Sequence, residues 1–323
     1  MTKQDLRIVF LGTPEFAVES LEAIISAGYN VVGVVTMPDK PAGRGHKMFE
    51  SPVKLCAVSH GIKVMQPANL KDAAFIEELR SLQAELFVVI AFRMLPEVVW
   101  SMPPLGTFNL HASLLPRYRG AAPINRAVIN GDTETGVTTF FLKHEIDTGD
   151  IIAQERVDIL PEDNVGTVHD KLMHLGARLT LQTIADIITG TLTTTPQDKL
   201  IGDIEPTPAP KIFKEDCRID WTQSRESVHN LVRGLSPYPG AWSEMVADDA
   251  SQGQIKIFET SLPEPTPEGV GAPGTVVIEG TRMFVYAADG PVEILSLQVA
   301  GKRRMDTASY LRGTRQENIR FEA

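Results

Sequence analysis

The chain has 323 residues, of which 43% are hydrophobic and 22% charged, and these proportions exclude a disordered chain, a collagen and a coiled coil. The formal net charge of −10 excludes nucleic-acid binding through overall charge, but it is compatible with a local basic patch. The two cysteines, Cys56 and Cys217, are far apart and form no CxxC pair, which excludes a disulfide scaffold and a cysteine-rich zinc site.

Up to residue 205 the sequence alternates short apolar runs with segments of helical periodicity. Strands are predicted at residues 7–11, 30–36, 63–65, 85–91 and 107–111. Helices are predicted at residues 14–27, 51–60, 72–83, 123–130 and 165–189. Apolar strands separated by helices form parallel sheets that are covered on both faces. We therefore predict an α/β domain over residues 1–205, built on a doubly wound, mostly parallel, Rossmann-like sheet.

The sequence changes character at residue 205. Residues 206–210 are rich in proline, which predicts a stiff, extended linker crossed by few contacts. Beyond it, glycine and proline separate β-like runs at residues 255–258, 274–278, 283–287 and 292–299. A lone helix is expected at residues 224–235. We predict that residues 211–323 form a smaller C-terminal β-barrel domain, similar to an oligonucleotide-binding (OB) fold.

Several common cofactor and metal motifs are missing. The turn after the first strand contains only Gly12 of the three glycines that a dinucleotide site needs. The sequence also lacks the phosphate-binding loop, the hydrolase serine motif and the zinc-binding helix motif. The seven histidines are scattered, and His169 and His174 fall on different faces of a predicted helix. We therefore expect no metal ion, and no stretch predicts a signal peptide or a membrane span.

Residues 106–149 carry the candidate chemistry. Asn109 and His111 share one face of a strand end, which is where parallel α/β sheets bind ligands, and Asp147 follows in a turn-like segment. Each of these residues alone is more often structural than catalytic. Together a carboxamide, an imidazole and a carboxylate suit acyl transfer to an amine, because they can stabilise an oxyanion, move a proton and orient the imidazole.

The motifs at residues 10–16, 41–45, 109–124 and 147–150, with 236–242 further on, resemble the methionyl-tRNA formyltransferase family over nearly the whole chain. The resemblance implies transfer of the formyl group of 10-formyltetrahydrofolate to the free α-amino group of methionyl initiator tRNA. The product would be N-formylmethionyl-tRNA, used in translation initiation, and no metal is needed. Asn109 and His111 would hydrogen-bond the formyl oxygen, His111 would also transfer a proton, and Asp147 would pair with His111 and set its protonation.

The resemblance also implies the positions of both substrates. A folate-binding loop would be formed by Ser113, Leu114, Leu115 and Pro116. The basic loop at residues 37–52 would enter the tRNA acceptor stem, with Arg44 and Lys47 touching nucleotides; as a Gly/Pro-rich stretch it is expected to have no structure of its own. A second basic cluster, residues 302–320, is equally consistent with a solvated surface and with tRNA binding.

One residue departs from the family pattern, and two other functions stay open. Arg93 stands where the family usually has glycine, so its side chain is expected to point outward or to pair with the ligand. A sugar-nucleotide N-formyltransferase would use the same folate donor. A non-catalytic RNA-binding protein would carry the triad of Asn109, His111 and Asp147 by accident. The basic loop and residues 120–124 favour the tRNA enzyme. We expect a cytoplasmic monomer.

Overall fold

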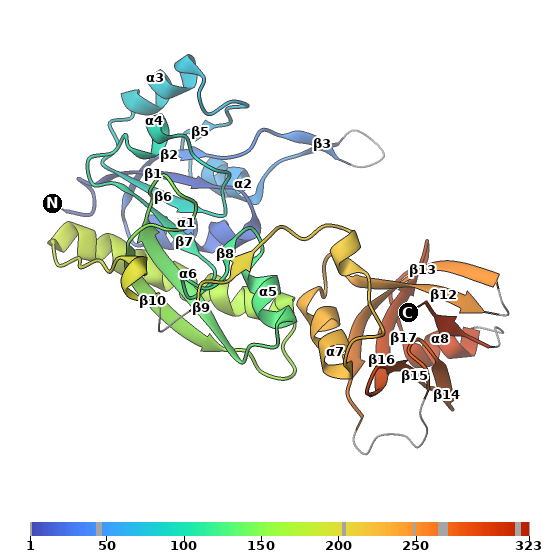
Figure 1. The fold of residues 1–323 in the computed structure, drawn as a ribbon. Helices are drawn as coiled ribbons and strands as arrows, with labels where there is room; N and C mark the ends of the chain where they lie inside the picture. The colour runs from blue at the N-terminus through green and yellow to red at the C-terminus, as the bar shows by residue number, and fades with distance from the viewer. Residues whose placement is uncertain are drawn as a thin grey trace. The chain divides into compact units, whose positions relative to one another are not determined.

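The computed structural model describes residues 2–42, 47–201, 205–247, 250–263, 271–313 and 318–322. By its internal contacts the chain divides into two compact units (Figure 1). The first unit comprises Met1–Ala121, Thr135–Val157 and His169–Ala209, and the second comprises Ala122–Glu134, Asp158–Val168 and Pro210–Ala323. Two segments that precede residue 205 therefore group with the C-terminal part. The division of the chain into two domains at residue 205 stays a prediction.

The elements that lie wholly or mostly in the first unit follow one another as β1 (Arg7–Gly12), α1 (Glu15–Ser26), β2 (Asn30–Val35), β3 (Lys40–Ala42), β4 (Lys47–Phe49), α2 (Pro52–Ser59), β5 (Val64–Met65), α3 (Ala73–Ser81), β6 (Leu86–Ile90), α4 (Glu97–Trp100), β7 (Thr107–His111), β8 (Arg119–Gly120), β9 (Glu134–Phe141), β10 (Ile151–Asp158), α6 (Val165–Thr189), the 3₁₀ turn η1 (Gln197–Lys199) and β11 (Pro208–Ala209).

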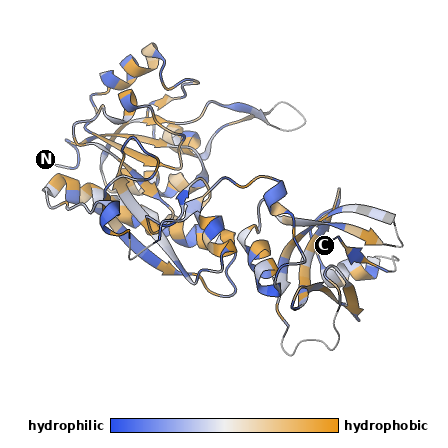
Figure 2. Cartoon of the chain, viewed as in Figure 1, coloured by the Kyte–Doolittle hydropathy of each residue, from blue (hydrophilic) through white to orange (hydrophobic). Residues whose placement is uncertain are grey.

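The first unit is built on a seven-stranded sheet with the order β10-β9-β7-β6-β1-β2-β5. Along the run β5-β2-β1-β6-β7, neighbouring strands pair in parallel, whereas β9 pairs antiparallel to β7. Val9 and Leu11 of β1 pack with α3 in one apolar cluster, whereas the alternate residues Ile8 and Phe10 are buried on the opposite side. Figure 2 shows these central strands as strongly hydrophobic. The predicted doubly wound, mostly parallel sheet is confirmed.

The structure of the first unit differs from the sequence prediction in two respects. Strands β9 and β10 were not anticipated, because their sequences mix threonine, glutamine and charged residues with apolar ones and contain no long apolar run. The loop at residues 37–52 does contain secondary structure, since β3 and β4 form an antiparallel pair in which Lys40 lies opposite Phe49. Each of these strands has three residues, which is too few for a periodic pattern to be recognised in the sequence.

The second unit contains α5 (Pro123–Ile129), the 3₁₀ turn η2 (Glu215–Cys217), α7 (Arg225–Gly234), β12 (Ala241–Ala247), β13 (Ala250–Ser261), β14 (Val276–Glu279), β15 (Arg282–Ala287), β16 (Gly290–Val299), β17 (Met305–Asp306), α8 (Thr307–Gly313) and β18 (Arg320–Phe321).

An antiparallel sheet with the order β14-β15-β16-β13-β12-β18 forms the body of the second unit. Its ends meet, because Thr275 bridges to Arg320 and the Phe321 amide donates to the Gly274 carbonyl at 2.8 Å. The predicted small barrel is confirmed, with the fully buried Trp221 in its core. The prediction of a lone helix is wrong, because α8 also lies here and α5 packs against α7. No described helix has both the length and the hydrophobicity that crossing a bilayer requires.

The proline-rich segment contains a short extended strand and makes contacts of its own with an earlier loop. Its strand β11 pairs in parallel with β8, with Pro208 opposite Arg119 and Ala209 opposite Gly120. The Arg119 amide donates to the carbonyl of Thr207 at 3.1 Å, and the Ala121 amide donates to that of Ala209 at 2.7 Å. The acceptor carbonyls belong to Thr207 and Ala209, each of which precedes a proline, so the segment offers acceptors to a neighbouring loop.

Candidate active site

Strand β7 brings Asn109 and His111 to its carboxyl end. The two residues are separated by one position, so their side chains leave the same face of the strand. The Asn109 Oδ1 atom is buried and has no hydrogen-bond partner among the described residues. A buried amide oxygen without a partner is uncommon in folded proteins and is typical of binding sites. The strand end therefore holds unused hydrogen-bonding capacity beside an imidazole.

The two nitrogens of the His111 ring have different surroundings. Its side chain is 7% exposed, and its Nε2 lies 2.8 Å from the carbonyl oxygen of Tyr118. A carbonyl oxygen only accepts, so Nε2 carries the hydrogen and donates it. The other nitrogen, Nδ1, faces Oδ2 of Asp147 at 3.9 Å. This separation is too long for a direct hydrogen bond, so Nδ1 is the ring atom available for proton exchange.

The Asp147 carboxylate is fixed by the backbone of two loops. Its Oδ2 accepts a hydrogen bond from the Gly120 amide at 2.9 Å, and its own backbone has a left-handed φ of 54°. Gly149 allows the loop to approach β9, because a Cβ at that position would lie 1.6 Å from the carbonyl oxygen of Phe141. The structure thus brings His111 and Asp147 together, as the sequence analysis expected of a catalytic pair.

A buried glutamine supports the Asp147 loop. The Nε2 of Gln197 donates to the carbonyl oxygens of Asp147 at 2.9 Å and Gly149 at 2.8 Å. The Oε1 of Gln197 accepts from the Arg119 guanidinium at 2.7 and 3.1 Å. The sequence analysis missed Gln197, since no motif surrounds it and its role depends on three segments that meet only in the fold.

The predicted folate loop is rigid. The Thr138 hydroxyl donates to the Ser113 carbonyl at 2.6 Å and accepts from the Leu115 amide at 3.1 Å. The side chains of Ser113, Leu115 and Pro116 are buried, and Leu114 is half-buried. Of the four predicted folate-binding residues, Leu114 therefore offers the most side-chain surface to a ligand.

The half-buried Arg93 side chain binds two backbone carbonyl groups, a contact that the sequence did not predict. Its guanidinium donates to the carbonyl of Ala68 at 2.9 Å and also to that of Pro67, which ties the loop after β6 to the loop after β5. Burial lowers the pKa of this guanidinium below its usual value. Residues 68–71 and 93–98 line a cavity of about 690 Å³ beside this contact.

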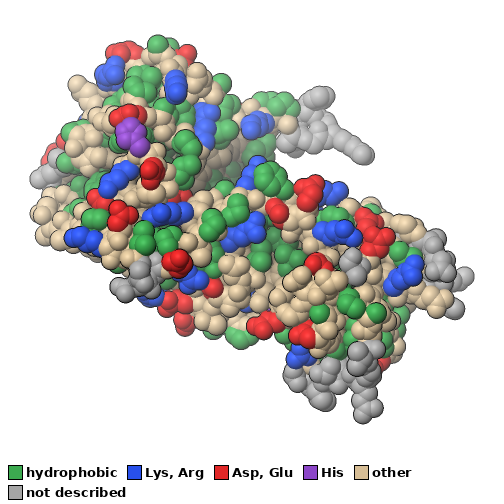
Figure 3. Space-filling model, viewed as in Figure 1, with side chains coloured by type: hydrophobic (Ala, Val, Ile, Leu, Met, Phe, Trp, Pro, Cys, Tyr) green, Lys and Arg blue, Asp and Glu red, His purple; other side chains and the backbone are tan. Residues whose placement is uncertain are grey.

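The β3–β4 hairpin contains one of the two predicted tRNA contacts. Lys47 begins β4, and Arg44 lies outside the described residues. Lys54, at the start of α2, binds both acidic residues of the segment, Asp39 and Glu50, and its hydrogen bond holds the pKa of the Asp39 carboxyl below its usual range. On the face drawn in Figure 3, basic and acidic side chains are intermixed.

Two family models match the chain. The model described as formyl transferase matches residues 6–184, and the model described as formyl transferase, C-terminal domain, matches residues 211–315. Each match falls largely within one of the two parts that the sequence analysis separated.

Curated relatives match over almost the full length. The chain is 58% identical over 315 residues to methionyl-tRNA formyltransferase of Bacteroides fragilis, covering 97% of this chain and 96% of that protein. It is 57% identical over 317 residues to the enzyme of the same name from Bacteroides thetaiotaomicron, covering 98% of each chain.

Solved structures share the fold at low sequence identity. A Helicobacter canadensis N-formyltransferase, solved with folinic acid and dTDP-3-aminofucose, superposes with a TM-score of 0.67 at 20% identity, covering 93% of this chain and all of that one. Aquifex aeolicus HypX, solved with tetrahydrofolic acid, superposes with a TM-score of 0.62 at 18% identity and covers 95% of this chain and 47% of that one.

Proposed function

Because the chain belongs to the methionyl-tRNA formyltransferase family, we propose that it transfers the formyl group of 10-formyltetrahydrofolate to the α-amino group of methionyl initiator tRNA. The observation that carries the proposal within this chain is the position of His111, held by the Tyr118 carbonyl and open toward Asp147. A relay of this kind suits an acyl transfer in which the acceptor amine is itself the nucleophile.

In this reaction Asn109, and His111 once its ring has gained a proton on Nδ1, stabilise the oxygen of the formyl group. As the amine attacks the formyl carbon, negative charge develops on that oxygen, and hydrogen-bond donors placed there lower the barrier. The Asn109 side-chain amide supplies one donor. One such donor contributes a factor of about 10²–10³ in rate.

His111 moves the proton that the attacking amine loses. Its Nε2 is occupied by the Tyr118 carbonyl, so the transfer runs through Nδ1, which faces the Asp147 carboxylate. The Tyr118 carbonyl keeps the ring oriented, and the Asp147 carboxylate stabilises the charge that the ring gains. His111 then gives this proton to the folate nitrogen as that nitrogen leaves the formyl carbon. The proton lost by the amine therefore ends on the folate product. A positioned acid–base group contributes a factor of about 10²–10⁴.

The substrates are held by separate parts of the chain. The loop of Ser113, Leu114, Leu115 and Pro116 cradles the folate through backbone groups and the half-exposed Leu114 side chain. Arg44 and Lys47 of the hairpin segment contact the tRNA, and the exposed cations Lys302, Arg303 and Arg304 offer phosphate contacts in the second unit. We propose that the enzyme acts as a monomer in the cytoplasm and needs no metal for the transfer.

The deciding experiment is a competition between acceptors. The purified chain receives 10-formyltetrahydrofolate together with methionyl initiator tRNA and a nucleotide-linked amino sugar, and both products are measured. We expect formylation of the tRNA alone. Preferential formylation of the sugar would support the sugar-nucleotide N-formyltransferase alternative, and tRNA binding without transfer would support a non-catalytic RNA-binding protein.

A further inference from the structure

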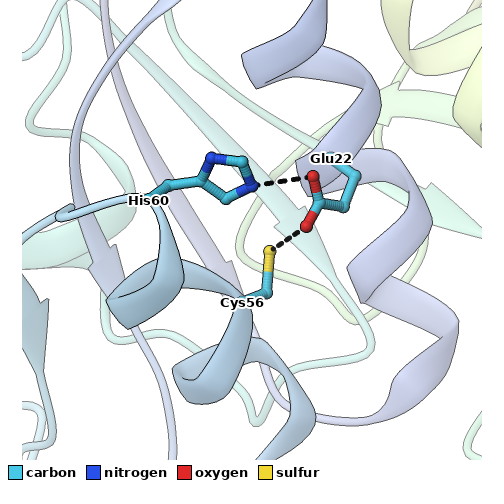
Figure 4. A group of neighbouring side chains, drawn as sticks. All are labelled: Glu22, Cys56 and His60. Carbon is cyan, nitrogen blue, oxygen red and sulfur yellow. Dashed lines mark hydrogen bonds and ion pairs between the residues drawn. The ribbon is translucent and has the colours of Figure 1, made fainter.

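Helices α1 and α2 are joined by three side chains that the proposed reaction does not use (Figure 4). The Cys56 thiol donates to Oε1 of Glu22 at 3.2 Å, and Nε2 of His60 lies 2.9 Å from the other oxygen, Oε2. The sulfur, the imidazole nitrogen and a carboxylate oxygen all lie within 4.8 Å of one another. The three side chains therefore offer three kinds of metal-ligand atom, a sulfur, a nitrogen and an oxygen.

The local structure explains why these ligands converge. Cys56 and His60 are four residues apart at the end of α2, so they lie on one face of that helix. Glu22 reaches them from α1, which packs beside α2. No spacing of histidines in the sequence predicts this group, because it contains one histidine and its carboxylate comes from another helix.

We propose that Glu22, Cys56 and His60 form a binding site for a divalent transition-metal ion of the zinc class, with water as the fourth ligand. Sulfur, nitrogen and oxygen ligands sit about 2.0–2.3 Å from zinc, which places neighbouring ligand atoms of a tetrahedral site roughly 3.3–3.8 Å apart. The observed separations of 2.9 and 3.2 Å are slightly shorter. A shared hydrogen draws these two pairs of atoms closer than a metal does, and the sulfur and the imidazole nitrogen lie within 4.8 Å of each other, so binding requires side-chain rotations that bring all three atoms to metal-ligand separations.

Charge favours a cation of two positive charges. Burial, followed by the hydrogen bond to Glu22, raises the pKa of the Cys56 thiol to about 12, so a bound ion must displace the thiol proton. A thiolate and a carboxylate together carry two negative charges, which a divalent ion neutralises. Cys56 is 7% exposed, whereas the side chains of His60 and Glu22 are 35% and 42% exposed. The site thus has a buried sulfur and a side open to solvent.

The binding step is balanced without any oxidant or co-reactant. The Cys56 S–H bond breaks, the thiolate sulfur bonds to the metal, and the proton leaves to solvent. Glu22 contributes a lone pair without losing a proton. The hydrogen that His60 Nε2 shares with Glu22 in the metal-free protein leaves to solvent while Nδ1 takes one up, so the neutral ring coordinates through Nε2 with no net change in its protons. One proton is released for each ion bound, so affinity rises with pH.

Cobalt(II) provides the direct test on the full-length chain, because a cobalt–thiolate bond gives an intense near-ultraviolet absorption band. We expect one equivalent of Co²⁺ to produce this band and Zn²⁺ to remove it. Cys56→Ser abolishes the band, and His60→Gln weakens Co²⁺ binding roughly tenfold or more. Cys217→Ser, at the other buried cysteine, is the matched control and leaves the band intact.

Two further measurements keep the outcome decisive. Calorimetry of Zn²⁺ binding in buffers of different ionisation enthalpy should give about one proton released per ion. If Cys56→Ser loses its circular dichroism spectrum, Glu22→Gln takes its place, because that side chain is partly exposed. No cobalt–thiolate band in the folded wild-type chain, or the same band in Cys56→Ser, overturns the proposal and leaves a hydrogen-bonded contact between two helices.

Discussion

The amide of Gly120 donates to Oδ2 of Asp147 at 2.9 Å, and this is the same oxygen that faces the His111 ring. Gly120 has a φ of 125°, and a Cβ there would lie 2.6 Å from the carbonyl oxygen of Ala209. Only glycine fits this position, which lies between the proline-rich strand and the carboxylate. The orientation of Asp147 therefore depends on a segment that carries no reactive group.

We predict that Asp147→Asn and His111→Ala each lower kcat by about 10²–10⁴ while changing KM for the folate little. The reason is that both residues act on the proton of the attacking amine rather than on folate binding. Steady-state kinetics with both substrates varied provides the measurement. Asp198→Asn, at an exposed position in η1, serves as the control. A triad variant that keeps wild-type kcat would remove that residue from the mechanism.

Gln197→Glu should impair the reaction from outside the triad. A carboxylate still accepts from Arg119 but cannot donate to the carbonyl oxygens of Asp147 and Gly149. Leaving such groups without donors costs about 1–3 kcal/mol each, so chemical unfolding should show lower stability. We also expect kcat to fall. Gln182→Glu, on the surface of α6, controls for the change of charge. Unchanged kcat in a folded Gln197→Glu variant would show that the loop keeps its position without this side chain.

Arg44→Ala should weaken the use of tRNA and leave folate binding intact. Loss of one phosphate contact reduces the slope of log affinity against log salt by about one unit. The measurement is KM for methionyl initiator tRNA over a range of salt concentrations. Arg80→Ala, at an exposed position of α3, removes one positive charge elsewhere and is the control. Identical salt dependence in wild type and Arg44→Ala would exclude Arg44 from the tRNA interface.

His229 should make the chain less stable in acid. Burial, with a smaller contribution from Arg233, lowers the pKa of this imidazole to about 4, from 6.5. Between pH 6.5 and 4 the unfolded chain therefore binds a proton that the folded chain does not, and stability falls as the pH falls through this window. The loss reaches at most about 3 kcal/mol, since one pKa unit corresponds to about 1.4 kcal/mol.

Urea unfolding at several pH values, followed by tryptophan fluorescence, checks this prediction. His229→Gln keeps a polar partner for the Thr260 hydroxyl, which lies 2.9 Å from the His229 ring, but does not titrate. The variant should lose less stability than wild type on acidification from pH 6.5 to 4. Parallel curves for the two proteins would mean that His229 does not cause the acid sensitivity.

The amino-acid pattern predicts elements whose side chains repeat over many residues. The helix expected at residues 165–189 is found with the same bounds, and the buried strands β1 and β6 are found within a residue of their predicted limits, because long amphipathic or wholly apolar runs dominate their neighbourhoods. The pairing of β8 with β11 could not be predicted in this way. Two residues on each side have no periodicity, and their partners are distant in sequence.

The residues of the candidate site differ in the same way in how far the sequence predicts them. Asn109, His111 and Asp147 stand in motifs that a reader of the sequence can find. The support of Asp147 by Gln197, and the contact of Arg93 with Pro67 and Ala68, arise from backbone carbonyl groups, which every residue possesses and no sequence motif marks. The candidate reactive side chains stand in sequence motifs, whereas the groups that contact them are found only in the fold.

The pairing of the proline-rich strand with the active-site loop also sets the order in which a newly made chain becomes an enzyme. Thr207 accepts from the amide of Tyr118, which was synthesised 89 residues earlier. A ribosome that adds about 5–20 residues per second needs roughly 4–18 seconds to cover that distance. Until then the loop that carries the Gly120 amide lacks its neighbouring strand. The growing polypeptide is therefore expected to stay inactive until the proline-rich strand has been translated.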